Sequence, residues 1–395
     1  MTRTTPTRVP QLDLKAQYAT IRREVEPALR RVCESGVFIL GPEGAALEGE
    51  LADYCGVAHA VGCASGSDAL LLSLAGLGVG PGDEVVTVPF SFFSTAGSVA
   101  RLGARAAFVD IEPRTFNLDP ARLADYFKSL PAQRRPRTKA LIPVHLFGQP
   151  ADMDEISQTA DKYEAPIIED AAQALGADYR GRRAGGLGRT ACFSFYPTKN
   201  LGAYGDAGLV TTDDDALAGR LRALRQHGGH DRYQHDTVGW NSRLDELQAA
   251  VLRVKFRRLE AWNVARQQHA ARYDQLLLAA GLAEHGKTYP DDEYPVVIPH
   301  RAANRRHIFH QYVVRVRARD ALRSSLREEG IEASVYYPTP LHLQKCFRTW
   351  GGRAGEFPES ERAAREALAL PLYPELTPEA LEYVAAKVAA FYQRG

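Results

Sequence analysis

The sequence shows little imbalance of charge and no long apolar run. Its 49 basic residues nearly match its 48 acidic residues, so no overall field attracts nucleic acid or an anionic membrane. Crossing a bilayer takes about eighteen or more apolar residues in a row, and the sequence has no such run. The stretch MTRTTPTRVPQLDLKAQY lacks the apolar core of a signal peptide. We therefore expect a cytoplasmic protein with neither a membrane nor a nucleic-acid partner.

Cysteine is scarce as well. The five cysteines are scattered, odd in number and free of Cys-x-x-Cys spacing, which favours reduced thiols in the core over disulfides. His227, His230 and His235 cluster near two aspartates, but they lack a ligand spacing such as His-Glu-x-x-His. We interpret this run as a polar loop and predict no metal site.

Short β-branched apolar runs alternate with helix-like stretches over the first half of the chain. This alternation is typical of a parallel sheet covered by helices, and it predicts a doubly wound α/β core. Ser67, Asp119 and Asp152 precede or open amphipathic stretches and are expected to start helices. The expected strands are residues 58–65, 84–90, 104–111, 139–147, 165–171, 191–196 and 208–212.

The pattern of apolar residues changes beyond Asn241. Residues 243–281 carry apolar positions three and four apart, which predicts a long helix or a pair of helices. A strand over residues 310–317 and a helix over 318–330 are expected to follow. We therefore divide the 395 residues into a large α/β domain, 1–258, and a smaller α+β carboxyl-terminal domain, 259–395.

Chemically useful residues follow several of the expected strands, where open α/β sheets bind their ligands. Ser65, Gly66 and Ser67 stand directly before a helix, a position that suits a phosphate, although a plain helix cap is the commoner meaning. Glu169 and Asp170 follow a buried run. A buried acid needs a compensating partner, and a protonated pyridine nitrogen would be one. An aspartate that caps a helix is the structural alternative.

Lys199 follows the aromatic strand at residues 191–196 by a short turn. Partial burial there would lower its pKa toward that of a usable nucleophile, whereas a lone loop lysine is more often solvated. Asp170 and Lys199 follow two strands that could be neighbours, and Ser194 is available for a phosphate. This combination favours a catalytic lysine.

Eight ordered motifs, spread over nearly the whole chain, resemble those of the DegT/DnrJ/EryC1/StrS aminotransferases. They are SGSDALLLSL, PGDEVVTVPFSFFSTAGSV, FVDIEPRTFNLD, PVHLFGQPADMD, IIEDAAQALGA, FSFYPTKNLGAYGDAG, GWNSRLDELQAAVL and VYYPTPLHLQ. The resemblance implies fold type I, the aspartate-aminotransferase-like fold. Its large domain holds a mixed, mostly parallel seven-stranded sheet and its smaller domain is α+β.

The resemblance also implies pyridoxal 5'-phosphate (PLP) as the cofactor. Lys199 would carry it and then move a proton between substrate carbon and cofactor. Asp170 would pair with the ring nitrogen and keep it protonated. Gln173 would bind the ring hydroxyl, and Phe92 would stack on the ring.

Further positions would hold the cofactor phosphate and imply an assembly. Gly66, Ser67 and Ser194 match the family residues that bind the phosphate within one subunit. Asn241, in GWNSRLDE, matches a residue that reaches the cofactor of the neighbouring subunit. A homodimer with shared active sites is therefore expected.

The resemblance implies transamination in two halves, in which L-glutamate gives its amino group to PLP and the pyridoxamine form then aminates a ketone. Relatives with histidine in place of the lysine catalyse dehydration instead. The stretch NLGAYGDAG resembles the subgroup acting on nucleotide-linked 3-keto sugars, so we predict amination at C3 of a dTDP-linked 3-keto-6-deoxyhexose. A 4-keto-sugar or keto-inositol aminotransferase of the same family is the alternative.

Substrate contacts are predicted at four positions. Arg232 matches a basic residue near the diphosphate in such relatives, although a solvated surface arginine is equally compatible with the sequence. Tyr196, Tyr337 and His342 are assigned to the sugar pocket, with core or lid positions as the alternative.

Two other classes of protein were weighed. The glycines of GLGVGPGDE precede an expected strand rather than a helix, so they fail the dinucleotide-binding fingerprint of an oxidoreductase. A non-catalytic PLP-binding regulator of transcription remains an alternative, although no basic amino-terminal DNA-binding domain is evident.

Overall fold

The computed structural model describes residues 8–131, 137–231 and 233–393. Its α-helices are α1 (Leu14–Ser35), α2 (Pro42–Cys55), α3 (Gly66–Gly76), α4 (Ser94–Arg101), α5 (Pro120–Ser129), α6 (Met153–Lys162), α7 (Asp215–Leu224), α8 (Glu246–Phe256), α9 (Leu259–Ala279), α10 (Arg319–Glu328), α11 (Pro358–Glu366) and α12 (Pro378–Gln393). Its strands are β1 (His59–Cys63), β2 (Glu84–Thr87), β3 (Arg105–Phe108), β4 (Thr138–Ile142), β5 (Ile168–Asp170), β6 (Asp178–Tyr179), β7 (Arg182–Arg183), β8 (Thr190–Ser194), β9 (Gly208–Thr212), β10 (Gly229–Asp231), β11 (Gln234–His235), β12 (Val296–Val297), β13 (Arg305–Arg306), β14 (Tyr312–Val316) and β15 (Ala367–Leu370).

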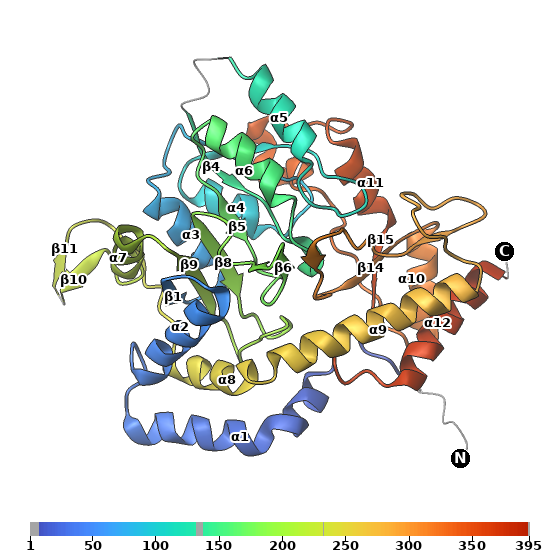
Figure 1. The fold of residues 1–395 in the computed structure, drawn as a ribbon, viewed down its shortest axis with the longest axis horizontal. Helices are drawn as coiled ribbons and strands as arrows, with labels where there is room; N and C mark the ends of the chain where they lie inside the picture. The colour runs from blue at the N-terminus through green and yellow to red at the C-terminus, as the bar shows by residue number, and fades with distance from the viewer. Residues whose placement is uncertain (1–7, 132–136, 232, 394–395) are drawn as a thin grey trace.

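A mixed sheet, mostly parallel, forms the centre of the amino-terminal part (Figure 1). Strand β2 pairs in parallel with β3 and β4, and β5 pairs in parallel with β8. Strand β9 lies antiparallel between β8 and β1. Parallel bridges from Leu141 to Ile167 and from Val144 to Asp170 join β4 to β5. The sheet order is therefore β3-β2-β4-β5-β8-β9-β1, which contains the seven strands predicted for the first half of the chain, whereas the strand predicted over residues 310–317 is β14 of another sheet.

Burial on both faces explains the apolar character of these strands. All four residues of β2 and all five of β9 are buried, as expected where helices cover both sides of a sheet. Figure 1 shows α3, α4 and α7 on one side and α2 and α8 nearer the other. This packing leaves the ends of the strands, rather than the faces of the sheet, available for chemistry.

The start of α3 differs from the expectation. Ser65, in an extended conformation, accepts a hydrogen bond from the Asp68 backbone N–H at 3.1 Å. Ser65 is therefore the N-cap, and the prediction that Ser67 caps this helix was wrong. The capping oxygen must reach the third helical N–H, and Ser65 stands at that spacing from Asp68. Gly66 and Ser67 consequently occupy the first turn, where backbone N–H groups lack partners within the helix.

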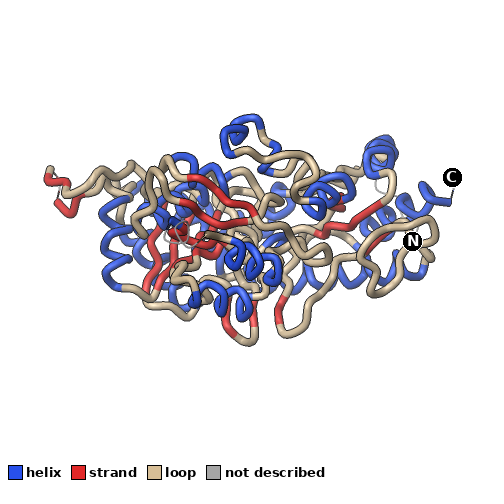
Figure 2. Tube along the Cα trace, turned by 90° about the horizontal axis from the view of Figure 1, so that it is seen from above, coloured by secondary structure: helices blue, strands red, loops and turns tan. Residues whose placement is uncertain are grey.

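The carboxyl-terminal part matches the expected change of pattern. Residues 243–281 form a pair of helices, α8 and α9, and α9 runs across the molecule toward α12 (Figure 1). Strand β14 lies between β12 and β15. Figure 2 shows the molecule as elongated in a view from above, with both described termini near the same end. Val9, near the amino terminus, bridges to Ile331 and belongs to the apolar cluster formed by α9, β14, β15 and α12. The first residues of the described chain therefore pack with the carboxyl-terminal part, and the domain division at residues 258 and 259 stays a prediction.

The remaining expectations have mixed outcomes. Cys55, Cys63 and Cys192 are buried thiols as predicted, but Cys33 and Cys346 are exposed, so the prediction of core positions was wrong for these two. Among the described residues, none of the helices combines the length and apolarity that a membrane crossing requires. The cytoplasmic location stays a prediction.

The cap of α5 gives a test of the fold. The Asp119 carboxylate accepts hydrogen bonds from the backbone N–H groups of Ala121 and Arg122 at 2.9 and 3.2 Å. Asp119→Ala should lower the free energy of unfolding by about 1 kcal/mol, because these donors lose their partner. Urea unfolding measures the change. Asp125→Ala on the same helix removes only an exposed pair with Lys128 and should change stability by less than about 0.5 kcal/mol. Equal losses in the two variants would contradict the capping role.

Candidate active site

Two ionisable side chains meet at the carboxyl ends of neighbouring strands. Asp170 ends β5, and Lys199 follows β8 by a turn closed by the Lys199 N–H and the Tyr196 carbonyl at 2.8 Å. Strands β5 and β8 are parallel partners, with Asp170 opposite Cys192. Each of the two groups favours the charged form of the other. The structure therefore brings together the pair that the sequence proposed.

Lys199 is prepared to act as a nucleophile. Burial lowers the pKa of its amine from 10.5 to about 8, against the opposing effect of the Asp170 carboxylate. A substantial neutral fraction of an amine is needed for attack on a carbonyl carbon. The turn that carries Lys199 leaves no room at Gly202, where an added Cβ would lie 2.3 Å from the Pro197 oxygen. The lysine thus leaves the sheet in a fixed direction.

Asp170 is an almost fully buried acid, with 5% of its surface exposed. Burial raises its pKa, while a hydrogen bond from Thr95, another from the Ala172 N–H, and the charge of Lys199 lower it. The Thr95 hydroxyl donates to Oδ2 at 2.8 Å, and the Ala172 N–H reaches Oδ1 at a long 3.3 Å. Such a carboxyl is only partly compensated, and a cationic partner in the site would stabilise its ionised form.

Glu169, the second acid of the same strand, has a different role. Successive strand residues point to opposite faces, and Glu169 is fully buried on the other face. Its carboxylate accepts hydrogen bonds at 2.7 to 3.0 Å from the N–H groups of Gly185, Leu187 and Gly188 and from His145 Nε2. Its acceptor capacity is used in holding the loop between β7 and β8, so Asp170 alone serves the site.

A small cup forms where α3 begins. A Cβ added to Gly66 would lie 2.5 Å from the Ser194 Cβ, so glycine lets the helix start approach the end of β8. The hydroxyl of Ser67 lies 2.5 Å from that of Ser94. Backbone N–H groups at a helix start, together with hydroxyls, suit a phosphate. The structure thus brings Gly66, Ser67 and Ser194 together.

Aromatic and amide side chains lie beside Asp170. Gln173 accepts from the Phe147 N–H at 2.7 Å, and its Nε2 donates to the Tyr337 hydroxyl at 3.0 Å. One N–H of this amide is left for another partner. Phe92 is 56% exposed, unusual for phenylalanine, and its ring centroid lies 6.2 Å from that of Tyr337. An open aromatic face beside an acid and an amide suits a flat polar ring.

The other predicted residues lie apart or outside the described chain. Asn241 is exposed and lines a surface cavity of about 350 Å³ with Asp206 and Arg243. His342 is buried, donates from Nε2 to Glu361, and lines a separate cavity of about 150 Å³ beside β3. Tyr196 is exposed next to the lysine turn. Arg232 lies outside the described residues.

Three hydroxyl side chains of the segment after β2 were not predicted as site residues from the sequence. Ser94 contacts Ser67, Thr95 contacts Asp170, and Ser91 contacts Thr95 at 2.8 Å. The signal was the run SFFSTAGS directly after an expected strand, from which only Phe92 was taken. A run of hydroxyls at a strand end is a recognisable feature of a polar ligand site.

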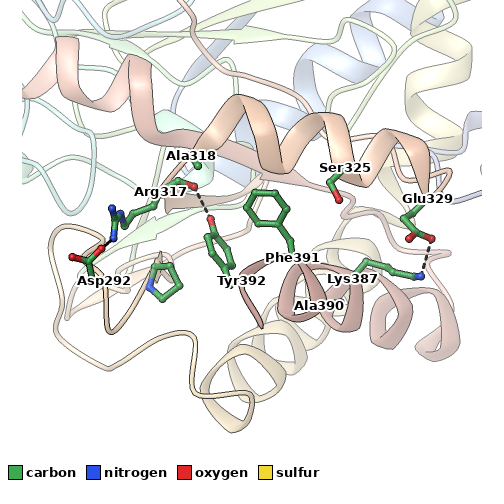
Figure 3. Close-up of a pocket in the computed structure, with 10 residues that line it drawn as sticks. Asp292, Arg317, Ala318, Ser325, Glu329, Lys387, Ala390, Phe391 and Tyr392 are labelled. Atoms are coloured by element: carbon green, nitrogen blue, oxygen red, sulfur yellow. Dashed lines mark hydrogen bonds and ion pairs between the residues drawn. The ribbon is translucent and has the colours of Figure 1, made fainter. Parts of the chain in front are cut away.

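One surface groove is lined by none of the residues of this site. This groove of about 710 Å³ lies between α10 and the end of α12 (Figure 3). Lys387 pairs with Glu329 at 2.7 Å, and Arg317 pairs with Asp292. Its charged side chains thus compensate one another and offer no reactive pair like Asp170 and Lys199. Across the residues that the structure describes, no cluster of metal-ligating side chains occurs.

The site residues fit PLP. A buried acid lacking a full counter-charge suits the ring nitrogen, a neutral-capable amine suits the aldehyde, and the cup at Gly66 and Ser194 suits the phosphate. The fold and this combination define the class of fold type I, aspartate-aminotransferase-like proteins.

Comparison with known proteins narrows the class to one family. Residues 19–389 match the model of the DegT/DnrJ/EryC1/StrS aminotransferase family. The chain therefore belongs to this family of aminotransferases. It is 49% identical to a pleiotropic regulatory protein of Geobacillus stearothermophilus, over 98% of this chain and 99% of that protein. It is 44% identical to dTDP-3-amino-3,4,6-trideoxy-alpha-D-glucose transaminase of Streptomyces venezuelae, over 95% and 94% of the two chains.

Solved structures agree. The crystal structure of DesV from S. venezuelae superposes with a TM-score of 0.91 at 43% identity, covering 98% of this chain and 99% of that one. NtdA from Bacillus subtilis, solved with bound cofactor PMP, superposes with a TM-score of 0.88 at 29% identity, covering 100% of this chain and 87% of that one. The predicted fold type is confirmed.

The pKa of Lys199 gives a test in protein stripped of cofactor. Unfolded lysine holds its proton up to 10.5 and folded Lys199 only to about 8, so stability rises with pH between these values. Below about 8 the fold carries the full cost of the buried charge. Lys199→Met should therefore be more stable than wild type by up to about 3 kcal/mol at pH 7, and the difference should vanish toward pH 10.5.

Urea unfolding at both pH values measures this difference. Lys139→Met is the matched control, because Lys139 is an exposed residue of β4. Its stability relative to wild type should not differ comparably between pH 7 and pH 10.5. A stability difference between Lys199→Met and wild type that stays constant with pH would show that the fold does not lower the pKa of the Lys199 amine.

Proposed function

We propose that this protein is a PLP-dependent aminotransferase that moves the amino group of L-glutamate to C3 of a dTDP-linked 3-keto-6-deoxyhexose. The observation that carries the proposal is the pairing of a buried acid, Asp170, with an amine of lowered pKa, Lys199, at adjacent strand ends. Perturbed pKa values at convergent strand ends are typical of catalytic sites.

Bound PLP supplies a ring that takes up the electron pair left when a substrate carbon loses its proton. Lys199 Nζ would take the proton from the amino-bearing carbon of L-glutamate and, in the second half of the reaction, would give a proton to the acceptor carbon that gains the amino group. Its pKa near 8 lets the amine act both as base and, once protonated, as acid close to neutral pH.

Asp170 holds a proton on the ring nitrogen. Its carboxylate pairs with that nitrogen through a charge-assisted hydrogen bond, which is strong in a buried site. Burial alone raises the pKa of this acid, and a cation at the ring nitrogen restores the ionised form. Gln173 uses one amide N–H on the Tyr337 hydroxyl, and its second N–H, which has no partner among the described residues, donates to the ring hydroxyl.

The remaining contacts fix the position of the cofactor. Gly66, Ser67 and Ser194 hold the phosphate at the start of α3. Phe92 covers one face of the ring and limits access of water. Tyr337, already bonded to Gln173, and exposed Tyr196 border the space left for the sugar.

Names of relatives support the substrate. The S. venezuelae transaminase is named for a dTDP-3-amino sugar, and a protein of Acidithiobacillus ferrooxidans at 42% identity is named a 3-aminotransferase of a UDP-linked 3-dehydro sugar. Both names place the amino group at C3, which favours the predicted position over C4. The dTDP carrier rests on the first of them, and the stretch NLGAYGDAG supports the 3-keto position.

We also propose a homodimer with shared sites. Val37, Phe38, Ile39 and Leu40 are each between 38% and 45% exposed, and a run of exposed apolar side chains marks an interaction surface. Ile39 lines the same cavity as Asn241. A second copy of the chain that covers this surface would bury the exposed apolar side chains and place Asn241 at the cofactor phosphate of the partner.

A PLP-binding regulator without catalysis is the second candidate. The name of the G. stearothermophilus relative, a pleiotropic regulatory protein, favours it, whereas the pairing of Asp170 and Lys199 favours catalysis. A spectroscopic experiment separates the two.

Purified protein should absorb in the visible after incubation with PLP, and borohydride should abolish the band. Lys199→Ala should lack it, because no amine remains to bond the aldehyde carbon. L-Glutamate should then shift the band to that of the pyridoxamine form with release of 2-oxoglutarate. A wild-type band that no amino donor alters would favour the regulatory role, and absence of any band would contradict both.

The position of amination is tested with two acceptors supplied side by side. Pyridoxamine-loaded protein should convert a dTDP-3-keto-6-deoxyhexose to a 3-amino sugar, with kcat/KM at least about tenfold above that for the matching 4-keto sugar. Mass spectrometry and NMR of the products identify the aminated carbon. Product at C4 alone would contradict the assignment. A UDP-linked 3-keto sugar tests the carrier in the same assay.

A further inference from the structure

One buried hydroxyl contacts the Asp170 carboxylate. Thr95, in the first turn of α4, is fully buried, and its Oγ1 lies 2.8 Å from Asp170 Oδ2. Ser91, also buried, lies 2.8 Å from Thr95 Oγ1. These three side chains form a short polar chain that runs from the loop after β2 to the acid of the site.

The direction of each hydrogen bond follows from the chemistry of its members. An ionised carboxylate can only accept, so Thr95 donates its single hydroxyl proton to Asp170. Thr95 Oγ1 must then accept in its contact with Ser91, whose hydroxyl donates. The Asp170 carboxylate therefore fixes the direction of both hydrogen bonds: Ser91 donates to Thr95, and Thr95 donates to Asp170.

This arrangement treats the two carboxylate oxygens unequally. Oδ2 accepts a short bond from Thr95, whereas among the described residues Oδ1 has only the long 3.3 Å contact with the Ala172 N–H. A buried hydroxyl donor also favours the charged form of the acid, against the effect of burial. Loss of the donor would leave the carboxyl freer to rotate and easier to protonate.

A purely structural role explains the contact less well. Within a helix, threonine commonly bonds a backbone carbonyl one turn earlier, but Thr95 of α4 bonds the side chain of Asp170, at the end of strand β5. Thr87 of β2 is a comparison, because it is also buried but donates to a backbone carbonyl, that of Ile142, at 2.8 Å. Comparing the two threonines therefore distinguishes the effect of removing a buried hydroxyl from the effect of removing a hydroxyl that contacts Asp170.

We propose that Thr95 is a positioning residue, with Ser91 behind it, that orients Asp170 and keeps it ionised toward the ring nitrogen of PLP. The inference rests on the proposed function, because it assigns Thr95 a role through the contact between Asp170 and that nitrogen. Thr95 acts on the cofactor only through the acid.

The experiment compares PLP with its 1-deaza analogue, in which a C–H replaces the ring nitrogen. Equilibrium dialysis with apoprotein gives the dissociation constant of each, without any turnover. Wild type should prefer PLP. Thr95→Val, which keeps the shape, should weaken PLP binding by about tenfold and leave the affinity for the analogue within about twofold, since the analogue has no nitrogen for Asp170 to bind.

Three variants make the result specific. Thr95→Ser keeps the hydroxyl and should restore the wild-type preference for PLP. Thr87→Val removes a buried hydroxyl of strand β2 that does not contact Asp170, and it should leave the preference for PLP unchanged, even if the protein becomes less stable. Should Thr95→Val fail to fold, Thr95→Ala measured in the same way decides the question.

Two results would overturn the inference in distinguishable ways. A wild-type preference that Thr95→Val retains in full, or an equal weakening of both ligands, would leave Thr95 with a structural role only. A wild-type protein that binds neither ligand, or both equally well, would remove the contact between Asp170 and the ring nitrogen. That second result would contradict the proposed function itself.

Discussion

The site depends on two opposite charges that share a poorly solvated space. Asp170 and Lys199 are each driven toward neutrality by burial, and each draws the other back toward its charged form. Neither effect wins completely, so the amine can lose a proton near pH 8 and the acid remains open to a cationic partner. A pair fully exposed to water would lack this balance, and a pair in direct contact would be locked in its charged form. The sheet sets the separation by ending β5 and β8 side by side.

Supporting residues are organised around this pair in two layers. Glu169, one residue before Asp170, uses its whole carboxylate to hold the loop between β7 and β8. Thr95 contacts Asp170 directly, from a helix that begins just after β2. A strand therefore supplies both a structural acid and a chemical one, because its side chains alternate between faces. Sequence proximity alone does not distinguish them.

Much of the fold could be predicted, and the reasons for the failures are physical. The central strands were found because burial on both faces makes them continuous apolar runs, and Lys199 and Asp170 were found because polar residues directly after such runs are unusual. The cap of α3 was wrongly assigned to Ser67 instead of Ser65, because two serines flank Gly66 and only the backbone geometry selects Ser65. Exposure of Cys33 and Cys346 depends on which helix face meets solvent. His342 stands in a motif of the family, yet Glu361, nineteen residues later, holds it in a separate cavity. Contacts of this kind have no local signature.

The first turn of α4 has a consequence for how this protein can vary. Ser94 reaches the cup at Ser67, and Thr95, the next residue, reaches Asp170. Neighbouring helical residues point about 100° apart around the axis, so one helical turn contacts both the cup at Ser67 and the acid Asp170. An inserted or deleted residue between Phe90 and Ser94 would rotate the two hydroxyls together and lose both contacts at once. Evolution can therefore exchange side chains along this segment far more readily than it can alter its length.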